Sequence, residues 1–180
     1  MAEGRAGSGR WVRLRIGGDI VTGSRLPSLG PRGEGWFVAQ LGMFVVIFAA
    51  AGLGPDWGGG ARLAALGAGA VLAVLGGLLA VWGLADLREN LTPFPRPLSG
   101  GHMIESGSYG LVRHPIYGGL VIGAAGWGLA TASLAALAAT LVLLAFFDLK
   151  SRREEAWLAD QYDGYDAYRS RTRRMLPWVY

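Results

Sequence analysis

The sequence has no cysteine, and only 17% of its 180 residues are charged. Without cysteine the chain can form neither a disulfide framework nor a thiolate metal site, and it gives no sign of its redox compartment. A soluble domain usually carries about 25% charged residues, whereas 52% of this chain is hydrophobic. One domain of this length does not need so many apolar residues for its core. We therefore predict an integral membrane protein with no metal site.

The first 35 residues lack any long apolar run. They combine glycines with six arginines, whereas a secretory signal needs an apolar segment of about 7–15 residues. We expect residues 1–35 to be a basic tail that is disordered or lies on a surface, and we predict no cleaved signal. Residues 36–180 are then the membrane domain.

Charge is also nearly missing from three long apolar segments, in which Asp148, near the end of the third, is the one charged residue. Segments 36–53 and 63–85 are each about long enough to cross roughly 30 Å of hydrocarbon at 1.5 Å per residue. Segment 116–149 is too long for one crossing and barely long enough for two, and the small residues from Thr131 to Ser133 predict a turn near its middle. Pro115 suits the first turn of a helix, where its missing N–H costs nothing.

These segments predict an all-α, polytopic membrane protein with a C-terminal helical hairpin. The four expected transmembrane helices span about 36–53, 63–85, 115–131 and 134–150. Glycines in the second and third helices are expected to allow close helix packing.

The basic residues give an independent test of this layout. Four crossings place sixteen of the seventeen basic residues on one side and leave only Arg62 opposite, as the positive-inside rule requires. A single helix over 116–149 would send the last seven across the membrane. We therefore predict that both termini, the loop 86–114 and the tail 151–180 are cytoplasmic. One lysine against sixteen arginines, with thirty glycines, suggests a GC-rich bacterial genome and hence the bacterial inner membrane.

Residues suited to chemistry gather in that loop and tail. From the residues alone, Glu154 and Glu155 have two readings: a cofactor site, or a solvated surface on which Glu154 pairs with Lys150. Arg113 and His114 precede a helix, where the helix dipole disfavours cations and favours an anion, so their placement indicates an anionic partner.

Three motifs in order carry a family resemblance. They are GSYGLVRHPIYGG (107–119), SRREEAWL (151–158) and QYDGYDAYRSRTRRMLP (161–177). In this order and spacing they resemble the isoprenylcysteine carboxyl methyltransferase and phospholipid methyltransferase family, which are integral membrane enzymes that use S-adenosylmethionine. The resemblance covers roughly residues 87–177, about half of the chain, and the first two helices match only in character.

The resemblance implies a cytoplasmic pocket for S-adenosylmethionine. The ring faces of Tyr109 and Tyr117 suit its sulfonium as cation–π partners, and a glycine such as Gly118 lets backbone approach a ligand closely. The expected cofactor-binding residues are Tyr109, Arg113, His114, Tyr117, Gly118, Glu154 and Glu155.

The resemblance also implies that Arg174 positions the methyl acceptor. A guanidinium suits a carboxylate and a lipid phosphate equally well, so it does not choose the substrate. A carboxylate acceptor needs no base, and positioning and desolvation then supply most of the catalysis. An amine or thiol would have to lose a proton, to His114 or to a glutamate. We therefore assign no general base.

Two other functions stay open at this point. An NADPH-dependent sterol or steroid reductase of related fold shares a similar arginine–histidine element, but such enzymes tend to carry asparagine where Pro115 stands. A non-enzymatic membrane protein is the second alternative, although the first three spans hold no charge that would mark a transport site, and the fourth holds charge only near its end. The expected partners are the lipid bilayer and a lipophilic acceptor. The net charge of +4 reflects membrane orientation and not nucleic acid. The sequence does not fix the acceptor or the oligomeric state.

Overall fold

Helices make up nearly all of the regular structure. The computed structural model describes residues 15–16, 19–20, 26–55 and 57–177, so most of the predicted tail lies outside the described residues. The helices are α1 (Glu34–Ala49), α2 (Gly59–Leu87), α3 (Ser108–Leu111), α4 (Pro115–Ala130), α5 (Leu134–Gln161) and α6 (Tyr165–Arg171), with a 3₁₀ turn η1 (Arg88–Asn90). In the described part, strands are limited to the antiparallel two-residue pair β1 (Arg15–Ile16) and β2 (Asp19–Ile20). The all-α prediction is confirmed apart from this pair.

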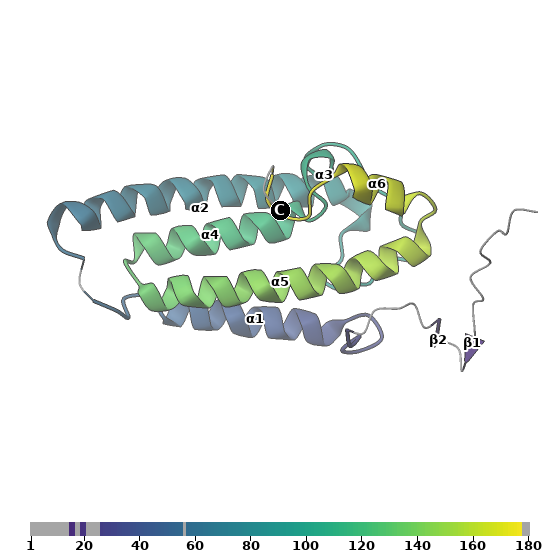
Figure 1. Cartoon of the computed structure of the whole chain (residues 1–180), viewed down its shortest axis with the longest axis horizontal. Helices are drawn as coiled ribbons and strands as arrows, with labels where there is room; N and C mark the ends of the chain where they lie inside the picture. The colour runs from purple at the N-terminus through teal and green to yellow at the C-terminus, as the bar shows by residue number, and fades with distance from the viewer. Residues whose placement is uncertain (1–14, 17–18, 21–25, 56, 178–180) are drawn as a thin grey trace, which may run out of the picture.

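The four long helices form one layer in the order α2, α4, α5, α1 (Figure 1). The predicted hairpin is α4–α5, since α4 ends at Ala130 and α5 begins at Leu134. Ser133 caps α5 by accepting a hydrogen bond from the Ala136 N–H. The same hydroxyl donates to the Ala50 carbonyl, so the hairpin turn is tied to the end of α1.

Glycines bring the backbones of α2 and α4 together. A Cβ at Gly76 would lie 2.5 Å from the Gly119 carbonyl oxygen, and a Cβ at Gly69 would lie 2.5 Å from that of Gly126. Small residues allow this approach in membrane helices, and the predicted packing role of these four glycines is confirmed. Gly77, in contrast, would place a Cβ in open space.

The lengths of the helices bear on the predicted crossings. Gly59–Asn90, which joins α2 to η1, and α5 are long and apolar enough to cross a bilayer, whereas α1 and α4 have 16 residues each. The outer surfaces of α1, α2 and α5 expose many large apolar side chains, among them Val45, Phe48, Leu63, Val74, Leu78, Val81 and Leu141. An exposed apolar surface of this extent indicates contact with lipid. Crossing by all four helices stays a prediction.

The two ends of the layer differ in polarity. At one end Arg62 donates to the Ala130 carbonyl, beside the hairpin turn. From Arg32 onward the other basic residues belong to segments at the opposite end, where α3, α6, the loop after α2 and the extension of α5 gather (Figure 1). The polar chemistry of the described chain is therefore concentrated at one end of an apolar layer.

The contact between α2 and α4 can be tested with two neighbouring glycines. Gly76→Ala forces a methyl group against the Gly119 carbonyl. Overpacking of this kind costs about 1–3 kcal/mol, so the midpoint of thermal unfolding in detergent should fall. Gly77→Ala is the control, and its midpoint should hold or rise because alanine is a better helix former by about 1 kcal/mol. Equal midpoints for the two variants would contradict the packing of α2 on α4.

Candidate functional site

A cavity of about 370 Å³ lies at the polar end of the layer. All four long helices contribute side chains to it, including Phe37 and Gln40 from α1, Leu84 from α2, Tyr117 and Leu120 from α4, and Lys150 and Glu154 from α5. The loop after α2 adds Pro93, Pro95 and Pro97 to the wall. The volume falls in the range of small-molecule and cofactor sites, about 300–1,000 Å³.

Asp86 fixes the end of that loop. Its Oδ2 accepts hydrogen bonds from the Ser108 N–H at 2.7 Å and from the Ser108 hydroxyl at 2.6 Å. Gly107 has a φ of +63°, and a Cβ there would clash with the Asp86 carboxylate. The backbone conformation at residue 107 and the closeness of the Asp86 carboxylate therefore both require glycine at this position.

The C-terminal segment is held against the start of α4 by backbone hydrogen bonds. The Arg113 N–H donates to the Arg173 carbonyl and the His114 N–H to the Arg174 carbonyl, both at 2.8 Å. A Cβ at Gly118 would collide with the Met175 carbonyl. Gly118 does not line the cavity. Its predicted contact with a cofactor stays a prediction, while in the structure this glycine makes room for the C-terminal segment.

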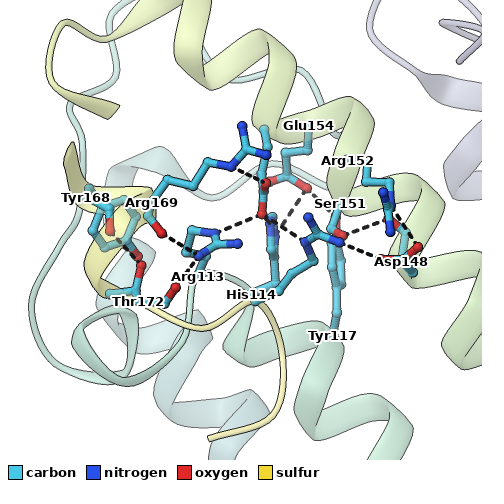
Figure 2. A network of polar contacts seen from close by, with 12 residues as sticks. Arg113, His114, Tyr117, Asp148, Ser151, Arg152, Glu154, Tyr168, Arg169 and Thr172 are labelled. Carbon is cyan, nitrogen blue, oxygen red and sulfur yellow. Dashed lines mark hydrogen bonds and ion pairs between the residues drawn. The ribbon is translucent and has the colours of Figure 1, made fainter. Parts of the chain in front are cut away.

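Glu155 is the centre of a buried ionic network. Its Oε1 accepts from Arg113 Nε at 2.9 Å and from Arg174 Nε at 3.3 Å, and it lies 3.2 Å from His114 Nε2. Arg169 Nε lies 3.5 Å from its Oε2. Figure 2 shows Arg113, His114 and Arg169 converging on this network. Arg113 also donates to the Arg169 and Thr172 carbonyls, so one guanidinium links α4, α5 and the C-terminal segment.

The environment of Glu155 keeps it ionised. Burial alone would raise the pKa of this carboxyl, because Glu155 is only 3% exposed. The hydrogen bonds and charges of His114 and Arg113 outweigh burial and lower the pKa to about 2. The carboxylate therefore carries its charge throughout the physiological pH range.

Glu154 has a different environment from its neighbour. It lines the cavity, and its Oε2 accepts the Tyr117 hydroxyl at 2.7 Å. Consecutive residues of a helix point about 100° apart, which explains the divergence of the two acids. The His114 ring stands between them, with Nδ1 3.8 Å from Glu154 and Nε2 3.2 Å from Glu155. It stacks on Tyr117 at a centroid distance of 5.3 Å.

The structure brings five of the eight predicted site residues to the cavity. They are Tyr109, Arg113, His114, Tyr117 and Glu154. Glu155, Gly118 and Arg174 are not on its wall. Arg174 contacts Asp148 Oδ1 through Nη1 at 2.6 Å and Glu155 through Nε, an arrangement that favours a structural role over contact with an acceptor. Within the described residues, no group of three or more His, Cys, Asp or Glu side chains could hold a metal ion.

Tyr165 and Lys150 also line the cavity, and neither was predicted as a site residue. Tyr165 is 2% exposed, and its hydroxyl has no hydrogen-bond partner among the described residues. Burial raises the pKa of Tyr165 far above its ordinary value, so the hydroxyl remains a donor. The break after α5, where Gly164 has a φ of +89°, turns Tyr165 toward the cavity. The second residue is Lys150, which is 2% exposed.

The Glu155 network can be tested by substitution. Glu155→Gln leaves Arg113 buried without its carboxylate, and removing one partner of a buried ion pair costs about 3–5 kcal/mol. We expect a large fall in unfolding midpoint, or loss of the folded protein. Glu154→Gln, the adjacent control, should lower it by far less because Glu154 faces the cavity. Equal losses in the two variants would contradict the assignment of separate roles.

The low pKa of Glu155 also predicts a dependence on pH. A carboxyl whose folded pKa is depressed stabilises the fold fully above its ordinary value of 4.5, and this contribution is lost as pH falls toward about 2. The difference in unfolding midpoint between the wild type and Glu155→Gln should therefore shrink as the pH is lowered through this window. A difference that stays constant from pH 6 to pH 3 would argue against an ionised Glu155 in the folded state.

No curated protein sequence matches the chain. The sequence model of a family described as phospholipid methyltransferase matches residues 64–164, more than half of the chain. The matched region runs from α2 to the end of α5 and includes the arginine–histidine turn and both glutamates. The chain therefore belongs to the phospholipid methyltransferase family.

Proposed function

We propose that this methyltransferase uses S-adenosylmethionine as its donor and methylates a lipophilic acceptor that reaches the cavity from the bilayer. Membership of the family supports methyl transfer at a membrane. The observation that carries the proposal is the cavity at the polar end of the layer, lined by His114, Tyr117 and Glu154 and bounded by apolar helices. A polar cofactor and an apolar acceptor can meet there.

The residues of the cavity fit the donor. The Glu154 carboxylate suits an ammonium group or ribose hydroxyls, through charge-assisted hydrogen bonds. The buried Tyr165 hydroxyl needs an acceptor, which a carboxylate or a ribose oxygen supplies. Tyr109 lines the same cavity and offers a ring face to a sulfonium. The Tyr117 ring, expected to do the same, is instead stacked on His114 and Phe147, which leaves its hydroxyl as the group it presents. These side chains suit the ammonium, carboxylate, ribose and sulfonium groups of S-adenosylmethionine.

Catalysis in this site depends mainly on positioning. When bound, S-adenosylmethionine supplies a methyl group on positively charged sulfur. The Glu155 network fixes the His114 ring, and stacking on that ring together with the Glu154 hydrogen bond fixes Tyr117. The prolines and leucines of the wall limit access of water. Holding reacting groups in line contributes up to about 7–11 kcal/mol.

We further propose that the polar end faces the cytoplasm of a bacterium, with α1 and α4 completing four crossings of the inner membrane. Helices of 16 residues require tilt, local thinning of the bilayer or both. The basic residues at the polar end support this orientation by the positive-inside rule. This orientation also places the cavity on the cytoplasmic side, where soluble metabolites are made.

The reductase alternative is less compatible with the cavity. Several phosphates of NADPH would need cationic partners. The arginine and lysine side chains of the wall are Arg113 and Lys150. Arg113 is already paired with Glu155 and bonded to two backbone carbonyls, which leaves one ammonium for several phosphates. A donor with one carboxylate and two positive charges matches this lining better. A non-enzymatic role is disfavoured by membership of a methyltransferase family.

Binding of S-adenosylhomocysteine, the product formed from S-adenosylmethionine, tests the donor. We expect purified protein in detergent to bind S-adenosylhomocysteine in isothermal titration calorimetry. Glu154→Gln should weaken binding about tenfold or more, since a hydrogen bond to a charged group contributes about 1.5–3 kcal/mol. Asp160→Asn, a substitution of an exposed carboxylate on the same helix, is the matched control and should bind like the wild type. Failure of the wild type to bind would overturn the proposed donor.

A further inference from the structure

Lys150 occupies the membrane-proximal side of the cavity. It is the one lysine of the sequence and lies one helical turn before Glu154 on α5. Its Nζ donates to Gln40 Oε1 at 2.6 Å and lies 4.8 Å from the centroid of the Tyr117 ring. The ammonium is thus held inside the cavity by α1 and α4 and does not reach out to water.

The charge of Lys150 is not balanced by a direct ion pair. Among the described residues, no carboxylate lies within 4.0 Å of its ammonium. Glu154, one turn away, accepts the Tyr117 hydroxyl. An ammonium has three N–H donors, and Gln40 is a neutral acceptor of one of them. Because a buried, unpaired charge is costly, this corner of the cavity is suited to an anion.

The surroundings of Lys150 indicate what kind of anion fits. Phe37 precedes Gln40 by one turn on α1, and Leu84 and Leu120 add apolar wall from α2 and α4. These residues belong to the apolar parts of their helices, whereas Glu154 and Leu158 continue along α5 toward the polar end. An anionic group on a long apolar chain therefore matches both the charge and the wall.

We propose that Lys150 and Gln40 form the head-group subsite for the acceptor, and that the acceptor is a long-chain carboxylic acid. This inference rests on the proposed methyltransferase function. It differs from the expectation for Arg174, whose guanidinium contacts Asp148 and Glu155 away from the cavity.

A carboxylate bound at this subsite requires no general base. One of its oxygens forms the new bond to the methyl carbon, while the electron pair of the broken carbon–sulfur bond stays on the sulfur of the donor, and no proton moves. The resulting ester is neutral and loses its attraction to Lys150. Release of product is thereby favoured over release of substrate.

Chemical labelling tests the subsite in the unaltered protein. An amine-reactive reagent can modify only Lys150 and the chain's N-terminal amine, because the sequence has no other lysine. We expect palmitate to slow modification of Lys150, measured by peptide mass spectrometry, about tenfold or more. Hexadecanol, of the same chain length without the charge, should give little protection, and the N-terminal amine is the internal reference. Equal protection by both, or none by palmitate, would overturn the inference.

Variants separate the acceptor from the donor. Lys150→Gln should weaken palmitate binding about tenfold or more, whereas Lys150→Arg should retain most of it. Gln40→Glu places a competing carboxylate beside the intact lysine and should also weaken palmitate binding. Binding of S-adenosylhomocysteine to Lys150→Gln should stay close to that of the wild type. If that binding falls and palmitate binding does not, Lys150 serves the donor carboxylate and the inference is wrong.

The two proposals fail in different ways. Absence of S-adenosylhomocysteine binding to the wild type, with palmitate binding that depends on Lys150, would overturn the donor and keep the anionic subsite. Normal S-adenosylhomocysteine binding, with palmitate binding unchanged in Lys150→Gln, would overturn the subsite alone.

Discussion

The arrangement of the polar end depends on one buried carboxylate, that of Glu155. Its contacts with Arg113, His114 and Arg174 join the start of α4, the extension of α5 and the C-terminal segment, which are far apart in the sequence. The guanidinium groups of Arg113 and Arg174 would be costly to bury without it. Because the network fixes the His114 ring, and that ring stacks on Tyr117, a structural ion pair also determines the shape of the cavity wall.

A membrane setting explains why this network lies where it does. Hydrocarbon excludes unpaired polar groups, so the apolar layer concentrates charge at one end. Within the layer, glycines let α2 and α4 approach closely, with Gly76 facing Gly119. The close contact of these two helices leaves the polar end to be completed by the loop and α6, which line the cavity, and by the C-terminal segment, which is bonded to the start of α4.

The sequence predicts the order of the elements better than the directions of their side chains. The hairpin turn at residues 131–133 follows from local residue chemistry, and it is observed. The assignment of Glu155 and Glu154 to different environments depends on the rotation of α5 about its axis. The first part of α5, residues 134–147, is apolar all round, and the consecutive charged residues after it do not mark one polar face, so the sequence does not predict that rotation. The contact of Gly118 with Met175, and the pairing of Arg174, likewise depend on where the C-terminal segment lies, a non-local feature that no local pattern encodes.

The same rotation of α5 creates a division of charge within the cavity. Lys150 and Glu154 both face it and lie one turn apart, so a cationic and an anionic group stand along one wall. Glu154 accepts a hydrogen bond from the Tyr117 hydroxyl, and Lys150 donates one to the Gln40 side chain. Both of these protein partners are neutral. In apolar surroundings, charges held in this way attract ligands more strongly than they would in water. Under the two proposals above, the two residues would draw a cationic donor and an anionic acceptor to adjacent positions, and the opposite charges of these ligands would favour the close approach that methyl transfer requires.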